Sequence, residues 1–334
     1  MHRFKNTKEL AEFLQTQRGK RVMLTFHSVG DTDAVSSAVA LSEYFNEAKI
    51  VTPDIITSNA NMILNRVGFE SMKIPTEFYE KAELIILLDA NNFEECGSLE
   101  KRISEFPGTI IIIDHHLQNQ IDKENLFIFD DENYCATASI IYELLGLLGM
   151  QIGKKEAMLL LTGIIADSAE LRNSTPMTFE QIGSLLKISK LNYYEIRKIM
   201  AKEESAEARA WAIKDLLGAE ITISNGILFV SGRAHAHANL SADNAVRLGA
   251  DISLFYSENE NEISFSARLN TDLDKRYNIH LGKIMRELAP IIKGTGGGHP
   301  SAAGAYGPLK LAGEEFIRKF FSECQKKIEN AKMN

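Results

Sequence analysis

The apolar residues of this 334-residue chain follow two patterns. The first part carries short continuous apolar runs, such as residues 110–113, between stretches with apolar residues at helical spacing, such as Ala34, Ala38 and Leu41. Continuous apolar runs are typical of parallel strands that are buried on both faces. Strands that alternate with helices in this way predict an α/β fold with a doubly wound, mainly parallel sheet. The expected strands are 21–27, 50–57, 83–89, 109–114 and 126–130.

The helical pattern dominates after residue 135 and then gives way to a polar segment. Helices are expected over 34–47, 136–149, 154–167 and 177–189. We therefore expect a first domain over 1–190. Residues 191–215 are polar and helix-prone, which predicts a linker helix.

From residue 216 the pattern is that of paired strands. Residues 221–223 and 227–230 flank Ser224-Asn225-Gly226, which is a hairpin turn signal, and residues 253–256 and 262–266 flank a second polar turn. Helices are expected over 279–292 and 313–330. These elements predict a smaller α+β domain over 216–334.

Composition adds limits on class and location. The length fits two domains, and 45% hydrophobic with 25% charged residues is ordinary for a globular protein. No apolar run is long enough to span a bilayer, and the first residues lack an apolar core of signal-peptide type, so the cytoplasm is the expected location. The three cysteines are widely spaced and predict free thiols. The net charge of −8 argues against a long nucleic-acid track, but a short anionic substrate is compatible with it.

Acids and histidines follow three of the expected strands. His27, Asp31 and Asp33 follow the first, Asp89 ends the third, and Asp114-His115-His116 follow the fourth. Ligands bind outside the carboxyl ends of parallel strands, so these side chains are expected at one edge of the sheet. Alternatives stay open, because Asp31 or Asp33 would also cap the helix that begins near Ala34. Asp167, which ends an otherwise apolar helix, needs a partner that could be a metal or an arginine.

Taken together, these residues predict a two-metal site. Carboxylates with a minority of imidazoles favour Mn²⁺ or Mg²⁺ over zinc, with Co²⁺ as a further alternative. Two such ions about 3.5–4 Å apart stabilise the attacking and leaving oxygens of phosphoryl hydrolysis and lower the pKa of a bridging water.

The second domain offers candidate phosphate contacts. Gly296, Gly297, Gly298 and His299 are expected to form a loop before a helix, where backbone N–H groups approach an anion closely. A flexible loop is the alternative. Arg268 is a candidate phosphate clamp through its planar guanidinium, with a surface arginine as the alternative.

In this order, His27-x3-Asp31-x-Asp33, Asp89, Asp114-His115-His116, Asp167 and the Gly-Gly-Gly-His299 segment resemble the DHH phosphoesterase superfamily with its DHH-associated carboxyl-terminal domain. The resemblance covers roughly residues 20–310, and it implies an active site in the cleft between the two domains. One departure is visible, because members often have Pro-Asp-Gly-Asp where this chain has Gly30-Asp31-Thr32-Asp33.

The resemblance implies roles for individual residues. One metal would be held by His27, Asp31 and Asp89, and the other by Asp33, Asp89, His115 and Asp167, with Asp89 bridging. His116 would contact the scissile phosphate, Asp114 would orient the histidines, and Arg268 with residues 296–299 would bind substrate.

Among members of the superfamily, the chain is most similar to the nanoRNases. This implies hydrolysis of short oligonucleotides and linear dinucleotides to mononucleotides by a hydroxide held between two metals, and also removal of the 3′-phosphate of adenosine 3′,5′-bisphosphate. Alternatives are a cyclic di-AMP phosphodiesterase, a single-strand exonuclease of RecJ type, and a non-catalytic metal- or nucleotide-binding sensor. The expected partners are the substrate and a second copy in a homodimer, with no membrane.

Overall fold

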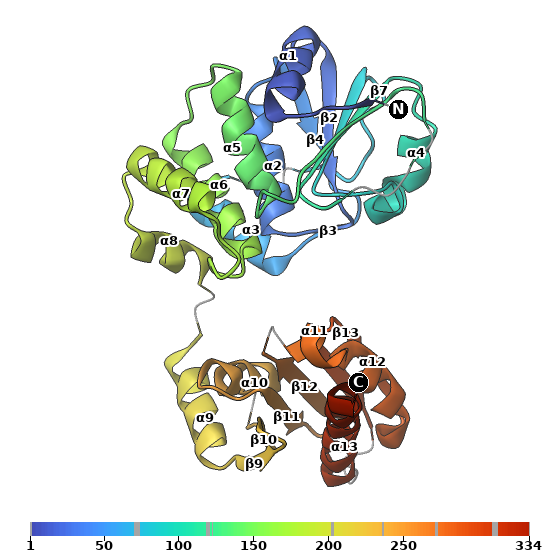
Figure 1. Cartoon of the computed structure of the whole chain (residues 1–334), viewed down its shortest axis with the longest axis vertical. Coiled ribbons are helices and arrows are strands. Elements are labelled where there is room, and N and C mark those ends of the chain that lie inside the picture. Colours follow the sequence, from blue (N-terminus) through green and yellow to red (C-terminus); the bar gives the residue numbers. More distant parts are fainter. Residues whose placement is uncertain are drawn as a thin grey trace. The chain divides into compact units, whose positions relative to one another are not determined.

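The structure is a computed structural model that describes residues 2–69, 74–117, 121, 123–201, 204–235, 237–270, 273–308 and 313–333. The chain divides into two compact units, residues 1–202 and 203–334. Figure 1 colours both units along the sequence.

The first unit is built on a six-stranded sheet with the order β1-β8-β7-β6-β2-β4, in which every neighbouring pair is parallel. The mainly parallel sheet is therefore confirmed. The chain leaves β2 towards β4 on one side and continues to β6 on the other, so the carboxyl ends of β2 and β6 form a topological switch point. The strands are β1 (His2–Arg3), β2 (Arg21–Phe26), β4 (Glu47–Ile50), β6 (Leu84–Leu88), β7 (Thr109–Asp114) and β8 (Leu126–Asp130).

Successive residues of each central strand point to opposite faces of the sheet, and both faces are covered. Leu24 and Ile86 pack in a core with the helices of one face, whereas Met23 and Ile85 pack with Cys96 and Ile103 on the other. The first face carries α1 (Thr7–Gln17), α2 (Thr32–Ser42), α3 (Ser58–Val67), α5 (Thr137–Leu147), α6 (Lys154–Asp167) and α7 (Pro176–Ser189), and the second carries a 3₁₀ helix (Glu94–Leu99) and α4 (Glu100–Ser104).

Two boundaries near residue 50 differ from the prediction. The strand expected over 50–57 ends at Ile50, and Pro53, which has no N–H to donate to a sheet, lies in the break. Residues Ile55–Ile56 form β5, which pairs with β3 (Val29–Gly30) in a separate two-stranded sheet. The helix expected over 34–47 ends at Ser42, since residues 47–50 are used as the edge strand β4.

The segment expected as a linker helix contains two helices in its described part, α8 (Tyr193–Met200) and α9 (Ala206–Leu217). Residues 202 and 203 lie outside the described residues. No described helix combines the length and the apolar character needed to cross a bilayer.

The second unit is an α+β unit whose sheet has the order β13-β14-β12-β11-β10-β9. Only the β10–β11 pair of this sheet is parallel, because α10 (Ala238–Arg247) crosses over between these two strands. The helix expected over 279–292 is α12 (Leu281–Leu288) continued by a 3₁₀ turn (Ala289–Ile292). The remaining elements are β9 (Glu220–Ser224), β10 (Ile227–Arg233), β11 (Ile252–Glu258), β12 (Ile263–Leu269), α11 (Leu273–Tyr277), β13 (Thr295–Gly298), β14 (Ala302–Gly307) and α13 (Gly313–Met333).

The glycine run is a strand and not, as predicted, a loop before a helix. Residues Thr295–Gly298 form the edge strand β13, which pairs with β14. The glycines are needed for packing, since a Cβ on Gly296 would lie 2.4 Å from the carbonyl oxygen of Met285 in α12. A Cβ on Gly297, which points the other way, would meet only Arg286, at 3.9 Å. The helix packs on one side of this strand, and Gly297 leaves the other side open.

Gly296→Ala is expected to lower stability by about 1–3 kcal/mol, because the backbone of α12 cannot move aside for the new methyl group. Gly297→Ala, in the neighbouring residue of the same strand, is the matched control and is expected to leave the unfolding temperature nearly unchanged. Thermal unfolding of the full chain measures both. Equal losses in the two variants would contradict this account of the glycine run.

Candidate metal centre

The predicted acids and histidines of the first unit converge at the carboxyl end of its sheet. Asp89 follows β6 directly and is 7% exposed. Its φ of +54° lies in the left-handed region, which only a few per cent of non-glycine residues adopt and which costs free energy unless the surroundings enforce it. The backbone therefore turns at the residue that lies between the other candidate ligands.

Three imidazoles surround the Asp89 carboxylate. His27 Nε2 lies 3.5 Å from Oδ2, whereas His115 Nε2 and His116 Nδ1 lie 3.7 and 3.9 Å from Oδ1. These distances are longer than hydrogen bonds and leave space between the nitrogen and oxygen atoms. Thr137 Oγ1 donates a hydrogen bond to Oδ1 at 3.2 Å, which fixes the carboxylate from the side of α5.

Asp31 caps α2 and also lies beside His27, so the cap leaves its candidate role as a metal ligand open. Its Oδ1 accepts a hydrogen bond from the backbone N–H of Ala34 at 3.1 Å and so caps α2, and the same oxygen lies 3.8 Å from His27 Nε2. Gly30, where the family pattern has proline, has no space for a side chain, because a Cβ would lie 2.4 Å from the ring of Phe26.

Asp33 is almost fully buried and binds the amino terminus of a different helix. Its two carboxylate oxygens accept hydrogen bonds from the backbone N–H groups of Thr137 and Ala138 at 2.7 and 2.8 Å. These groups belong to the first turn of α5, which has no capping side chain of its own. The helix terminus stabilises the anion and aims it.

The two adjacent histidines have different acidic partners. His115 Nε2 lies 2.9 Å from Asp167 Oδ2, whereas His116 Nδ1 lies 3.0 Å from Oδ1 of the fully buried Asp114. Asp114 Oδ1 also accepts from the backbone N–H of His116 at 3.1 Å, so it fixes both the ring and the main chain of that residue.

The donor atoms fall into three groups within which all ligand atoms lie within 4.8 Å of one another. The groups are His27 with Asp31 and Asp89; Asp33 with His115 and Asp167; and Asp89 with Asp114, His115 and His116. Asp89 and His115 each belong to two of them, so the groups adjoin.

The residues present fit divalent cations. His115 Nε2 and Asp114 Oδ2 are buried, and neither has a hydrogen-bond partner of suitable geometry among the described residues, although Asp167 lies close to His115. A cation would give the His115 nitrogen a partner. The donors are carboxylate oxygens and imidazole nitrogens, the set that suits ions such as Mn²⁺ and Mg²⁺.

The electrostatics of the cluster also favour a cation. Burial raises the pKa of the Asp33 carboxyl well above its usual range, and the neighbouring charges of Asp89 and Asp167 add to this effect. Burial alone would lower the pKa of His27, but Asp31 and Asp89 raise it to about 10. The hydrogen bond to Asp114 is the main cause that raises the pKa of His116 to about 9. This concentration of buried carboxylates needs positive charge, which protons or metal ions can supply.

Thr137 and Ala138 belong to this site and were not predicted from the sequence. They contribute mainly backbone N–H groups, which every residue except proline has, so their residue types do not reveal the role. The only hint is that small residues begin the predicted helix 136–149, the next element after the predicted strand 126–130.

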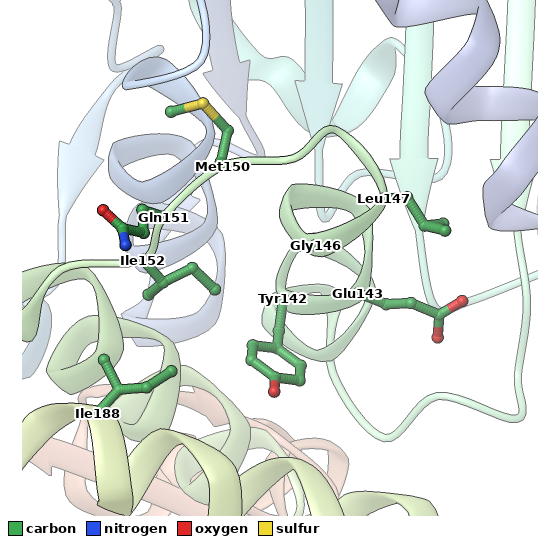
Figure 2. Close-up of a pocket in the computed structure, with 8 residues that line it drawn as sticks. All are labelled: Tyr142, Glu143, Gly146, Leu147, Met150, Gln151, Ile152 and Ile188. Atoms are coloured by element: carbon green, nitrogen blue, oxygen red, sulfur yellow. The ribbon is translucent and has the colours of Figure 1, made fainter.

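A pocket of about 650 Å³ lies elsewhere in the first unit (Figure 2). Its wall comes from the carboxyl-terminal half of α5, the following loop and Ile188 of α7. The acidic cluster instead contacts the amino terminus of α5, through Asp33. The acid in its lining, Glu143, accepts hydrogen bonds from Thr7 and Tyr134. The pocket is therefore not part of the candidate metal centre.

The predicted substrate-binding residues of the second unit gather at one end of its sheet. Arg268 of β12 pairs with Ala302 of β14, and the neighbouring Ala303 pairs with Gly298 of β13. The exposed His299 forms the turn between these strands, and its N–H donates to the Ala302 carbonyl at 2.8 Å.

Arg268 is held by neighbours that the sequence did not identify. Its Nε donates to Asp243 Oδ1 of α10 at 2.6 Å, and Nη1 donates to Ser266 Oγ and to the Ala267 carbonyl. Nη2 is therefore the guanidinium nitrogen without a described hydrogen bond.

Comparison with known proteins agrees with this arrangement. Residues 21–164 match the model of the DHH family, N-terminal domain, and residues 232–327 match that of the DHHA1 domain. The chain belongs to the DHH superfamily of phosphoesterases. This DHH protein is 26% identical over 330 residues to an uncharacterized protein of Methanocaldococcus jannaschii, covering 96% of this chain and 97% of the relative.

Two further relatives cover different lengths of the DHH protein. A probable manganese-dependent inorganic pyrophosphatase of Lactobacillus delbrueckii subsp. bulgaricus is 27% identical over 175 residues, covering 51% of this chain and 55% of the relative. The crystal structure of an exopolyphosphatase-related protein from Bacteroides fragilis aligns with a TM-score of 0.71 at 17% identity, covering 97% of this chain and 98% of that protein. The second likeness confirms the fold over nearly the whole chain.

Asp89→Asn is expected to weaken the binding of divalent metal by more than the roughly 10- to 100-fold that loss of an outer-shell partner costs. Asparagine tolerates a positive φ, so the variant removes the charge while it keeps the backbone conformation. Titration calorimetry with Mn²⁺ measures the affinity and the stoichiometry. Glu12→Ala, which removes an exposed acid of α1, is the control, and equal affinities in the two variants would contradict the assignment of Asp89.

Proposed function

We propose that this DHH protein is a metal-dependent phosphodiesterase that hydrolyses short oligonucleotides and linear dinucleotides to mononucleotides, in the manner of a nanoRNase. The observation that carries the proposal is the position of Asp89 between the group His27–Asp31 and the group His115–Asp167. This arrangement offers ligands for two cations that share one carboxylate.

Two bound divalent ions, with Mn²⁺ as our proposal, would supply an activated water and neutralise charge on the phosphate. His27, Asp31 and Asp89 would hold one ion, and Asp33, Asp89, His115 and Asp167 the other. Neighbouring groups hold two of these carboxylates in position. Asp33 is aimed by the first turn of α5, and Asp89 is fixed by Thr137.

His116 is the proposed contact to the scissile phosphate. Its ring is more than half exposed, while Asp114 holds Nδ1 and the backbone N–H from within the sheet. Nδ1 is therefore engaged, and Nε2 is the ring nitrogen that can donate to a phosphate oxygen or to the leaving oxygen. A buried carboxylate behind an exposed imidazole is the arrangement by which proteins fix the tautomer and direction of a functional histidine.

Two features support a preference for short substrates: the net negative charge of the chain and the small number of proposed phosphate contacts in the second unit. A net charge of −8 supports no extended track for a polyanionic backbone. Arg268 and the open face of Gly297 are the proposed contacts to one phosphate, with Arg268 Nη2 as the donor. A site with few cationic contacts gains little from additional nucleotides.

A substrate comparison tests the proposal. With Mn²⁺ present, linear di-adenylate is expected to give AMP faster than a long single strand, cyclic di-AMP, adenosine 3′,5′-bisphosphate or pyrophosphate is turned over, with anion-exchange chromatography as the readout. Equal rates on the dinucleotide and the long strand would contradict the length preference. Fastest cleavage of pyrophosphate would replace the nanoRNase proposal with pyrophosphatase activity. Metal binding without any turnover would favour a sensor.

Arg268→Ala is expected to raise KM for the dinucleotide by about 10- to 100-fold with a smaller change in kcat, because a charge-assisted hydrogen bond to the bound phosphate is lost. Asp243→Asn is expected to raise KM by a smaller factor, since Arg268 keeps its charge but loses its orientation, and Asp243→Glu is expected to restore part of the affinity. Arg247→Ala removes an exposed arginine of the same helix as Asp243 and serves as control. A loss confined to kcat in Arg268→Ala would instead assign this residue to the transition state.

A further inference from the structure

A second group of polar and aromatic residues lies in the second unit, away from Arg268. Trp211 and Asp215 belong to α9, His235 follows β10, and Ser241 lies in α10. Arg268 of β12 pairs with Ser253 of β11, which pairs with Val230 of β10. His235 is five residues further along the chain than Val230. At about 3.3 Å per residue this is about 16 Å along the strand direction.

The carboxylate of Asp215 is buried, and only 3% of the residue is exposed. Its described partners are His235 and Ser241. Its Oδ1 lies 2.6 Å from His235 Nδ1 and accepts from the backbone N–H of His235 at 3.2 Å, while Oδ2 accepts from Ser241 Oγ at 2.7 Å. Burying a carboxylate costs free energy unless its hydrogen bonds are satisfied. Here these bonds fix both the ring and the main chain of one histidine.

The histidine that Asp215 fixes is itself on the surface. The His235 side chain is 56% exposed, and no described residue forms a hydrogen bond with its Nε2. Because Ser241 binds the carboxylate and not the imidazole, the three residues do not form a nucleophilic triad. The arrangement holds an imidazole rigid and presents it to solvent.

The imidazole is stacked on the indole of Trp211. The ring centroids lie 4.3 Å apart with an interplanar angle of 21°, and the Lys214 ammonium lies 4.3 Å from the centroid of the indole. Trp211 is 38% exposed. Two stacked and partly exposed rings with a cation beside them are the elements with which proteins bind bases of single-stranded nucleic acids and nucleotides.

We propose that Trp211 and His235 form a stacking site for a nucleobase, distinct from the Arg268 end of the sheet. The base lies on the exposed face of the His235 ring, Trp211 supports the opposite face, and Asp215 keeps the ring from rotating. The Lys214 ammonium lies over the indole ring and adds positive charge to the stack. The site binds the base of a mononucleotide, and its existence does not depend on which phosphoester the metal centre hydrolyses.

Trp211 is the single tryptophan of the chain, so its fluorescence reports on this site alone. The full chain is titrated with AMP, adenosine and inorganic phosphate in the presence of EDTA, which prevents turnover, with excitation at the red edge of the indole band. AMP and adenosine are expected to quench the emission to saturation, and phosphate is expected not to do so. His235→Ala is expected to weaken AMP binding by roughly 5- to 100-fold, whereas His235→Phe is expected to retain most of it, since a flat ring remains.

His237→Ala, which removes an exposed histidine two residues along the chain, is the matched control, and the thermal unfolding of each variant checks its fold. Arg268→Ala is expected to leave the quenching unchanged. The proposal is overturned if AMP does not change the emission, if phosphate acts as AMP does, or if the loss in His235→Ala is no greater than in His237→Ala. Loss of quenching in Arg268→Ala alone would place the nucleotide at the other end of the sheet and would also overturn it.

Discussion

The carboxylate of Asp89 is the interaction on which the metal centre depends. It follows a fully buried strand, adopts a positive φ, and has imidazoles of three histidines within 3.5 to 3.9 Å. The fold makes this possible because β6 lies between β2, which delivers His27, and β7, which delivers His115 and His116. The parallel register of three neighbouring strands brings residues 27, 89 and 115 together although they are far apart in the sequence.

The amino termini of two helices hold further carboxylates of the candidate metal centre in position. Asp31 caps its own helix, and Asp33 binds the first N–H groups of α5, a helix more than 100 residues later in the chain. Capping by these acids therefore does not exclude a role for them in metal binding. A carboxylate that accepts a hydrogen bond from a helix terminus keeps lone pairs for a cation and is held in one orientation for it.

The sequence predicted the elements that a strong apolar pattern marks. Strands β2, β6, β7 and β8 and helix α6 were predicted within one or two residues, and the acids and histidines that follow them converge as expected. The breaks at Pro53 and Ser42 were missed, because the apolar pattern continues past them while the backbone changes partner. The glycine run was misassigned as a loop, since the requirement for glycine comes from the backbone of α12, which no local pattern reveals. Partners such as Asp243 and Thr137 depend on tertiary contacts and carry no motif.

Electron paramagnetic resonance of the Mn²⁺-loaded DHH protein tests most directly whether Asp89 joins two metal sites. If one carboxylate bridges two ions about 3.5–4 Å apart, the spectrum at full loading is that of an exchange-coupled manganese pair. In Asp89→Asn the coupling is expected to disappear. A spectrum of isolated, uncoupled Mn²⁺ in the native chain at two equivalents of metal would contradict the shared-carboxylate arrangement and the mechanism built on it.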